Sequence, residues 1–216
     1  MSCLKQFTTL VFDMDGVLFF SSEAHGAAYD RTFKAYGYHG LPYAEIAGVR
    51  TDDAFRRVLS HEDVVESDAL IEELTVTKRK WAGLLLRESP PVVPNCRFIL
   101  EQLQERFTLG LASSASKGTV DLFLDASGTR DLFQAVLSGQ DVQDSKPSPE
   151  IFSKAMQRLH VEPEATAIVE DSVAGVIAGT RAGATVIGVR GTVEDSVLLA
   201  NGAKVVVSGI QDLLSL

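Results

Sequence analysis

Six short apolar segments alternate with segments of helical periodicity, and this alternation restricts the possible fold more than any other feature of the sequence. Most of the apolar segments are rich in β-branched residues or leucine, as buried parallel strands are. They are Thr9–Phe12, Thr108–Ala112, Ala135–Leu137, Thr166–Val169, Thr185–Val189 and Lys204–Val207. The helical segments between them are Arg97–Arg106, Gly118–Ala126, Pro149–Leu159 and Val173–Ala182. The alternation predicts a doubly wound α/β fold with a parallel sheet.

The stretch from Ser21 to Glu88 interrupts this alternation. Its pattern of apolar residues indicates successive amphipathic helices and no strand. The proline-rich segment Ser89–Pro94 follows, and proline ends helices because it lacks the backbone N–H group. We therefore expect a helical insert directly after the first strand.

Length and charge restrict the class of protein. The 216 residues, 45% of them hydrophobic, suffice for one sizeable core and a small second module. A formal net charge of −9 argues against a nucleic-acid partner, since nucleic-acid binding relies on a basic surface. The first apolar segment is too short for a membrane span and lacks a signal-peptide cleavage pattern. We expect a cytoplasmic monomer with no nucleic-acid or membrane partner, and reduced thiols at Cys3 and Cys96 because their spacing is not that of a paired site.

The segment TLVFDMDGVLFF, residues 9–20, places Asp13 and Asp15 two residues apart just after the first predicted strand. In an open parallel sheet, ligands bind beyond the carboxyl ends of the strands. Polar residues occupy the corresponding positions after other predicted strands; they are Ser113 and Ser114, Lys146, and the pair Glu170 and Asp171. The sequence therefore predicts that these side chains meet at one edge of the sheet.

This set of residues suits phosphoryl transfer through an aspartate. Asp13 would attack phosphorus and form an aspartyl-phosphate. Asp15 would protonate the leaving oxygen and later activate water, a role that contributes about 10²–10⁴-fold to the rate. Lys146 would balance the charge of the nucleophile and the phosphate, and Ser113 and Ser114 would bind the transferring oxygens.

The clustered acids also predict a metal site. A carboxylate cannot approach a phosphate dianion unless a cation lies between them, and carboxylate oxygens are the ligands that Mg²⁺ prefers. We expect a Mg²⁺ cofactor, with ligands from Asp13, Asp15, Glu170 and Asp171.

Four motifs, in order along the chain, resemble those of the haloacid dehalogenase superfamily. They are DMDGV, the serine of LASSAS, the lysine of SKPSPEIF and the Glu-Asp of VEDSVAGVIAGTRAGA. The helical insert resembles the mobile cap of the beta-phosphoglucomutase and phosphoglycolate phosphatase branch. The resemblance implies a Rossmann-like core of residues 1–16 and 92–216 and a helical cap domain of residues 17–91. It also implies a small phosphorylated metabolite as substrate, of the sugar phosphate or phosphoglycolate type.

The cap offers two further candidates for substrate binding. His25 falls where phosphatases and mutases of this branch often keep a histidine, and Arg50 lies in a loop placed like a mutase loop. The lysine, arginine and serine that a beta-phosphoglucomutase carries in that loop align here with Ala47, Thr51 and Ala54. Without those groups a second phosphate is poorly held, so the resemblance favours hydrolysis over a mutase.

Two other features of the sequence concern the cap lysines and the hinge. Phosphonate-cleaving relatives need a cap lysine, but we expect Lys34, Lys78 and Lys80 on solvated helix faces. Many relatives carry an aspartate where Phe20 stands; Phe19 and Phe20 would either wall the entrance above the acids or pack the hinge against the cap.

Three functions therefore stay open: a Mg²⁺-dependent phosphatase, a phosphosugar mutase, and a non-catalytic sensor that binds a phosphorylated metabolite. Every catalytic residue expected for an enzyme is present, which favours the phosphatase over the sensor.

Overall fold

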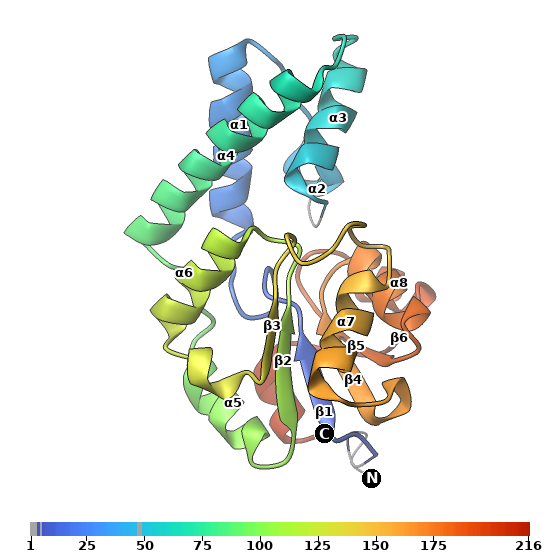
Figure 1. Ribbon diagram of the computed structural model, residues 1–216. Helices are drawn as coiled ribbons and strands as arrows, with labels where there is room; N and C mark the ends of the chain where they lie inside the picture. The colour runs from blue at the N-terminus through green and yellow to red at the C-terminus, as the bar shows by residue number, and fades with distance from the viewer. Residues whose placement is uncertain (1–3, 5, 47–48) are drawn as a thin grey trace.

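The computed structural model describes residues 4, 6–46 and 49–216, and Figure 1 shows that they form a sheet with flanking helices and a separate group of helices. The strands are β1 (Thr9–Phe12), β2 (Thr108–Ala112), β3 (Ala135–Leu137), β4 (Thr166–Glu170), β5 (Thr185–Val189) and β6 (Ala203–Val207). All six predicted strands are confirmed; β4 ends one residue later than predicted and β6 begins one residue earlier.

The sheet is parallel throughout, in the order β3-β2-β1-β4-β5-β6. Strand β1 lies at its centre, with Thr9 opposite Thr108 of β2 on one side and Thr166 of β4 on the other. The connections run outward from β1 in both directions, so the carboxyl ends of β1 and β4 flank the crevice where ligands bind in such sheets.

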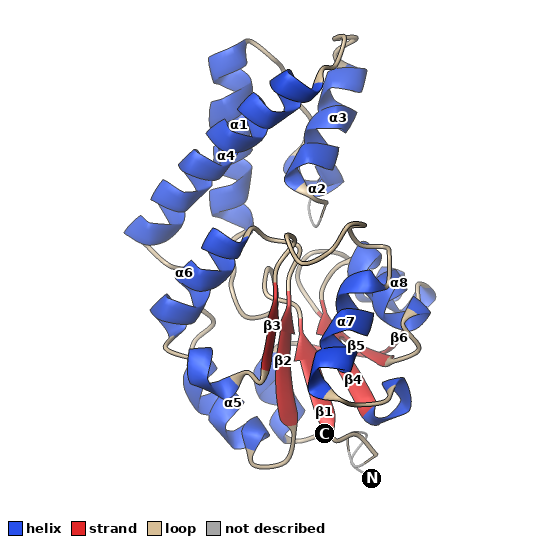
Figure 2. Ribbon diagram, viewed as in Figure 1, coloured by secondary structure: helices blue, strands red, loops and turns tan. Residues whose placement is uncertain are grey.

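Helices cover both faces of the sheet, as Figure 2 shows. They are α5 (Cys96–Gln104), α6 (Lys117–Ser127), α7 (Glu150–Leu159), α8 (Val173–Arg181) and α9 (Asp195–Ala200), with short 3₁₀ helices at Arg130–Leu132, Pro163–Ala165 and Ile210–Leu214. Alternate residues of β1 serve the two faces: Leu10 and Phe12 pack in the core beneath α5 and α6, and Val11 packs in the core beneath α7 and α8. Both faces are buried, which explains why the strands are almost continuously apolar.

The insert is helical, as expected. It comprises α1 (Ser22–Tyr36), α2 (Tyr43–Ile46), α3 (Thr51–His61) and α4 (Asp68–Glu88), and its described part contains no strand. Its own apolar core holds Tyr29, Phe33 and Phe55, with the rings of Tyr29 and Phe55 centred 5.4 Å apart. The α/β core with an inserted helical cap is thereby confirmed; the exact domain boundaries stay a prediction.

The two connections between the cap and the sheet run side by side. Val93 N donates to Leu18 O at 3.0 Å, and Phe20 N donates to Pro91 O at 2.8 Å. Phe19 is fully buried with its ring 5.5 Å from that of Phe123, whereas Phe20 is 55% exposed. Of the two phenylalanines, only Phe19 therefore packs the hinge.

No helix in the described part of the chain is long and apolar enough to cross a bilayer. The thiol of Cys96 is free and buried, and Cys3 lies outside the described residues.

Candidate active site

The carboxyl ends of β1 and β4 bring three acids together. Asp13 follows β1, Glu170 ends β4 and Asp171 comes next, so the pairing of the two strands sets the acids side by side. One ligand oxygen from each of the three lies within 4.8 Å of the others, and all three side chains are buried. The sequence prediction that these groups converge at one sheet edge agrees with this geometry.

Lys146 supplies the positive charge beside these acids. Its Nζ lies 2.5 Å from Asp13 Oδ1 and 2.8 Å from Glu170 Oε1. Burial by itself would lower the pKa of Lys146, but the charges of Asp13 and Glu170 hold it above its usual value, so the ammonium stays protonated. Burial, and then the charge of Glu170, raises the pKa of Asp171 to about 8.

These electrostatics fit a divalent cation. Three buried carboxylates face one ammonium, and the raised pKa of Asp171 shows that its ionised form is unfavourable in the protein alone. A cation among these oxygens would favour that ionised form, and carboxylate oxygens are the ligand type that Mg²⁺ takes.

Hydrogen bonds from the start of α8 hold the carboxylate of Glu170 in place. Ser172 donates to Glu170 Oε2 from both N, at 2.7 Å, and Oγ, at 3.0 Å. The Ser172 hydroxyl also accepts from Gly175 N at 3.1 Å, which caps the helix. A Cβ on Gly175 would lie 1.7 Å from Glu170 Oε1, so this glycine allows the helix to approach the acid closely.

Asp15 does not belong to the three-acid cluster, although we expected it among the metal ligands. Its carboxylate instead faces the cap: Ser21 Oγ donates to it, and His25 Nε2 lies 3.5 Å from its Oδ1. Burial alone would raise the pKa of Asp15, but the hydrogen bonds from His25 and Ser21 and the charge of Lys78 hold it below its usual value. Asp15 is therefore an anion in the ligand-free site.

The position of Lys78 differs from the one expected from the sequence, because its side chain is buried. Lys34 and Lys80 are exposed as expected, but Lys78 is only 5% exposed, with Nζ 3.1 Å from His25 Nδ1 and 4.4 Å from the centre of the Tyr29 ring. Leu74, Lys78 and Ala82 follow one another at four-residue intervals on the buried face of α4, and this periodicity was the available signal.

A relay of contacts joins Lys78, His25 and Asp15. Burial, and then the charge of Lys78, lowers the pKa of His25, so the ring is neutral. Because the ammonium of Lys78 donates to Nδ1, the ring proton resides on Nε2 and faces Asp15. Burial also lowers the pKa of Lys78, to about 8.

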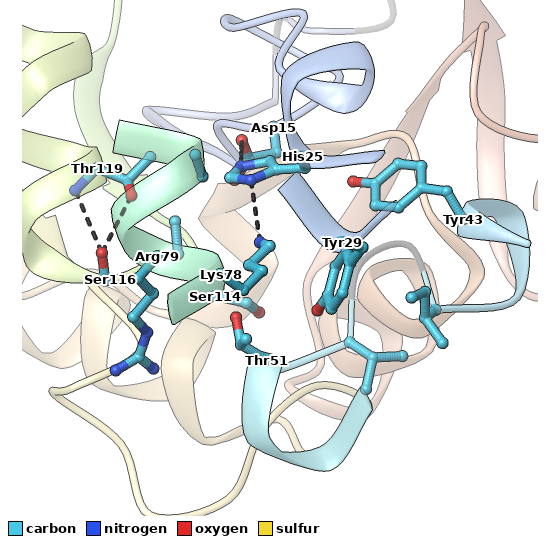
Figure 3. Close-up of a pocket in the computed structure, with 14 residues that line it drawn as sticks. Asp15, His25, Tyr29, Tyr43, Thr51, Lys78, Arg79, Ser114, Ser116 and Thr119 are labelled. Carbon is cyan, nitrogen blue, oxygen red and sulfur yellow. Dashed lines mark hydrogen bonds and ion pairs between the residues drawn. The ribbon is translucent and has the colours of Figure 1, made fainter. Parts of the chain in front are cut away.

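Two adjoining cavities lie between the sheet edge and the cap. The first, the cap cavity, is shown in Figure 3; it is lined by Asp15 and Ser114 from the core and by His25, Tyr43, Thr51, Lys78 and Arg79 from the cap, among others. The second, the acid cavity, is lined by Asp13, Lys146, Glu170, Asp171 and Thr192, and it shares Asp15, Tyr43 and Ser114 with the first. A ligand in the cap cavity would therefore lie next to the acids.

The two serines after β2 differ in position. Ser114 lines both cavities. Ser113 is fully buried, donates to Asp15 Oδ2 at 3.5 Å and accepts from Ala115 N at 3.0 Å. Of the two expected phosphate-binding serines, Ser114 is the one that a ligand can reach.

Arg50 is not among the residues that line these two cavities, and its role in substrate binding stays a prediction. Its guanidinium pairs with Asp52, and Nη1 donates to Gln143 O at 3.1 Å, which links the cap to the core. Of the three positions that depart from the mutase loop, Thr51 lines the cap cavity, Ala54 is buried and Ala47 lies outside the described residues.

Comparison with known proteins finds one matching family model and relatives that are named as phosphatases. Residues 10–189 match the family model described as haloacid dehalogenase-like hydrolase. The chain is 30% identical over 200 residues to validoxylamine A 7'-phosphate phosphatase of Streptomyces hygroscopicus subsp. limoneus, covering 88% of each chain. It is 29% identical over 187 residues to the phosphorylated carbohydrates phosphatase of Thermotoga maritima, covering 81% of each.

Among solved structures, the fold is similar to that of a putative beta-phosphoglucomutase from Thermotoga maritima. The TM-score is 0.74 and the identity 27%, with 97% of each chain covered. The cap and core thus share one arrangement of elements with a member of the branch that the motifs indicated.

Proposed function

The chain belongs to the haloacid dehalogenase-like hydrolase family, and from this we propose that it is a phosphatase that hydrolyses a small phosphorylated metabolite through an aspartyl-phosphate. The observation that best supports the proposal is the position of Asp13. Its carboxylate is buried against the protonated Lys146 and beside Asp171, in a cavity that adjoins the one beneath the cap.

Asp13 acts as the nucleophile. Its oxygen forms a bond to phosphorus while the bond between phosphorus and the ester oxygen breaks, and the leaving oxygen takes a proton from Asp15. Water then attacks the phosphorus and gives a proton back to Asp15, which releases phosphate and restores the Asp13 carboxylate. Lys146 stays protonated and stabilises negative charge on Asp13 and the phosphoryl oxygens.

Asp15 must carry a proton at the first step, although its partners keep it ionised in the ligand-free site. A phosphate dianion beside Asp15 raises the pKa of its carboxyl through like-charge repulsion. Substrate binding thus favours proton uptake, while the relay from Lys78 through His25 keeps the carboxyl oriented.

Asp13, Glu170 and Asp171 would hold Mg²⁺. When bound, the cation offsets the repulsion between the carboxylates and the phosphate and polarises the phosphoryl oxygens.

The cap cavity supports a substrate of the sugar phosphate or phosphoglycolate type. Three residues that carry hydroxyl groups, Tyr43, Thr51 and Ser116, line it together with the basic residues Lys78 and Arg79. Such a lining suits a small anionic compound with several hydroxyl or carboxylate oxygens. Relatives whose names refer to phosphorylated carbohydrates and to validoxylamine A 7'-phosphate are consistent with this class.

The experiment is a screen of phosphorylated metabolites with Mg²⁺ in which released phosphate and isomerised product are measured separately. Phosphorus NMR of a hexose 1-phosphate, with a bisphosphate primer added, distinguishes hydrolysis from rearrangement. We expect inorganic phosphate without a hexose 6-phosphate intermediate. Appearance of the 6-phosphate ahead of phosphate would identify a mutase, and no turnover of any compound would contradict the enzyme assignment.

A further inference from the structure

The geometry points to Thr192 as a positioning residue for the cation site: its hydroxyl holds one oxygen of the Asp171 carboxylate and thereby presents the other to the cation. This inference rests on the metal dependence proposed above. Thr192 lies in the loop after β5 and was not a candidate from the sequence.

The hydrogen bond is the first observation. Thr192 Oγ1 donates to Asp171 Oδ2, and the Asp171 side chain belongs to the buried acid cluster. The two residues meet because β4 and β5 are neighbours, with Glu170 opposite Gly188. Arg190 N donates to Val207 O at 2.9 Å, and Gly191, with φ of 147°, lets the chain turn toward Asp171.

The backbone of Gly16 also packs against Oδ2 of Asp171. A Cβ on Gly16 would lie 1.8 Å from Asp171 Oδ2 but 3.2 Å from Oδ1, so the Gly16 backbone packs directly against Oδ2. Gly16 also has a φ of 81°, which disfavours any other residue there. Thr192 and Gly16 together limit rotation of the carboxylate, and no hydrogen bond within the described residues occupies Oδ1.

The consequence concerns cation affinity. Partners that orient a metal-ligating carboxylate commonly contribute about 10–100-fold to affinity or activity. Thr192 also lines the acid cavity with Asp13 and Lys146, so its hydroxyl donates where negative charge is concentrated. Without that donor, Asp171 turns more freely, and its repulsion from Glu170 is less offset.

The test measures cation binding directly on protein stripped with a chelator, by electron paramagnetic resonance with Mn²⁺ and by competition with Mg²⁺. Thr192→Val keeps the side-chain shape and removes the hydroxyl, and Thr192→Ser keeps the hydroxyl. Thr180→Val is the matched control, because Thr180 is an exposed residue whose hydroxyl donates to Val176 O, at 2.8 Å, within α8. Thermal unfolding of each variant verifies the fold, and Thr192→Ala replaces the valine variant should that variant not fold.

We expect Thr192→Val to weaken Mn²⁺ affinity by about 10-fold, and Thr192→Ser and Thr180→Val to stay within about threefold of wild type. Unchanged affinity of Thr192→Val would overturn the inference, as would equal losses in the valine and serine variants. A wild type that binds neither cation would instead contradict the proposed metal dependence, and the inference with it.

Discussion

At the scale of single residues, the site combines groups that are unfavourable in isolation. Asp171 is buried beside Glu170, and Lys78 is buried beside a neutral histidine. In the proposed function, a cation would offset the charge of the acids, and Asp15 together with a bound phosphate would offset the charge of the lysine. Such costly groups in a cavity are typical of functional sites rather than of sites that stabilise the fold.

The nucleophile role proposed for Asp13 gives the first prediction. Asp13→Asn keeps the side-chain volume but removes the attacking carboxylate, so kcat is expected to fall more than about 10³-fold while the fold is kept. Phosphate release with the best substrate from the screen measures this, and circular dichroism verifies the fold. Activity close to that of wild type would show that Asp13 is not the nucleophile.

Lys78 gives a second prediction, in which activity and stability change in different directions. Lys78→Met keeps the length of the side chain but loses the donor to His25, so kcat/KM is expected to fall about 10²-fold. The free energy of unfolding is expected to stay the same or rise, because a buried charge is replaced by an apolar group. Lys80→Met, two residues further on an exposed face, is the control and should change neither quantity. A lower stability with unchanged kcat/KM would assign Lys78 a structural role.

At the scale of elements, strand pairing and one helix start position the acids. The pairing of β1 with β4 brings Asp13 next to Glu170 and Asp171, and Ser172 at the start of α8 donates to the Glu170 carboxylate. Each element places its residue because the element itself is held by the apolar cores on the two faces of the sheet.

Gly175 tests the contact between α8 and Glu170. In Gly175→Ala the new methyl group would lie 1.7 Å from Glu170 Oε1, so something must shift, and we expect a loss of about 1–3 kcal/mol in the free energy of unfolding. Gly83 of α4 is the matched position, since a Cβ there meets nothing nearer than Arg87 Nη1 at 3.6 Å. Gly83→Ala is expected to be neutral or to stabilise by up to about 1 kcal/mol. Urea unfolding measures both, and similar effects at the two positions would contradict the close approach of α8.

At the scale of the whole molecule, the cap and the core meet above the acids at several points. Lys78 and His25 reach Asp15 from the cap, and Ser145 Oγ, in the loop that carries Lys146, donates to Asp53 Oδ2 of the cap at 3.0 Å. The catalytic residues proposed here therefore depend on both parts of the chain, and on the charge balance between them.

That charge balance predicts how stability depends on pH. Folding raises the pKa of Asp171 from its usual 3.8 to about 8, so the folded chain keeps a proton that the unfolded chain loses. The stabilisation is complete below about pH 4 and is lost as pH rises toward 8, on the order of 1 kcal/mol per pH unit. In chelator, the melting temperature of the wild type should therefore fall from pH 6 to pH 8 more than that of Asp171→Asn. Saturating Mg²⁺ should reduce the difference between the two proteins. Equal pH dependence of their melting temperatures would contradict the raised pKa of Asp171.

The sequence by itself determined the sheet, the helices and the order of the polar residues after the strands. Apolar periodicity is a local property, and the strand at Thr9–Phe12 or the helix near Val173 can be recognised without knowing its neighbours. The convergence of Asp13 with Glu170 and Asp171 followed as well, because carboxyl ends of parallel strands meet at one edge.

Only the tertiary structure decided which side chains face the cavities. Ser114 lines them rather than Ser113, Arg50 turns to Asp52, and Lys78 is buried where a solvated helix face was expected. Thr192 reaches Asp171 from a different loop. Of these outcomes, only the burial of Lys78 had a local signal, in the four-residue spacing of Leu74, Lys78 and Ala82. The others depend on side-chain rotation and on contacts between segments far apart in the chain, which local patterns of residues do not encode.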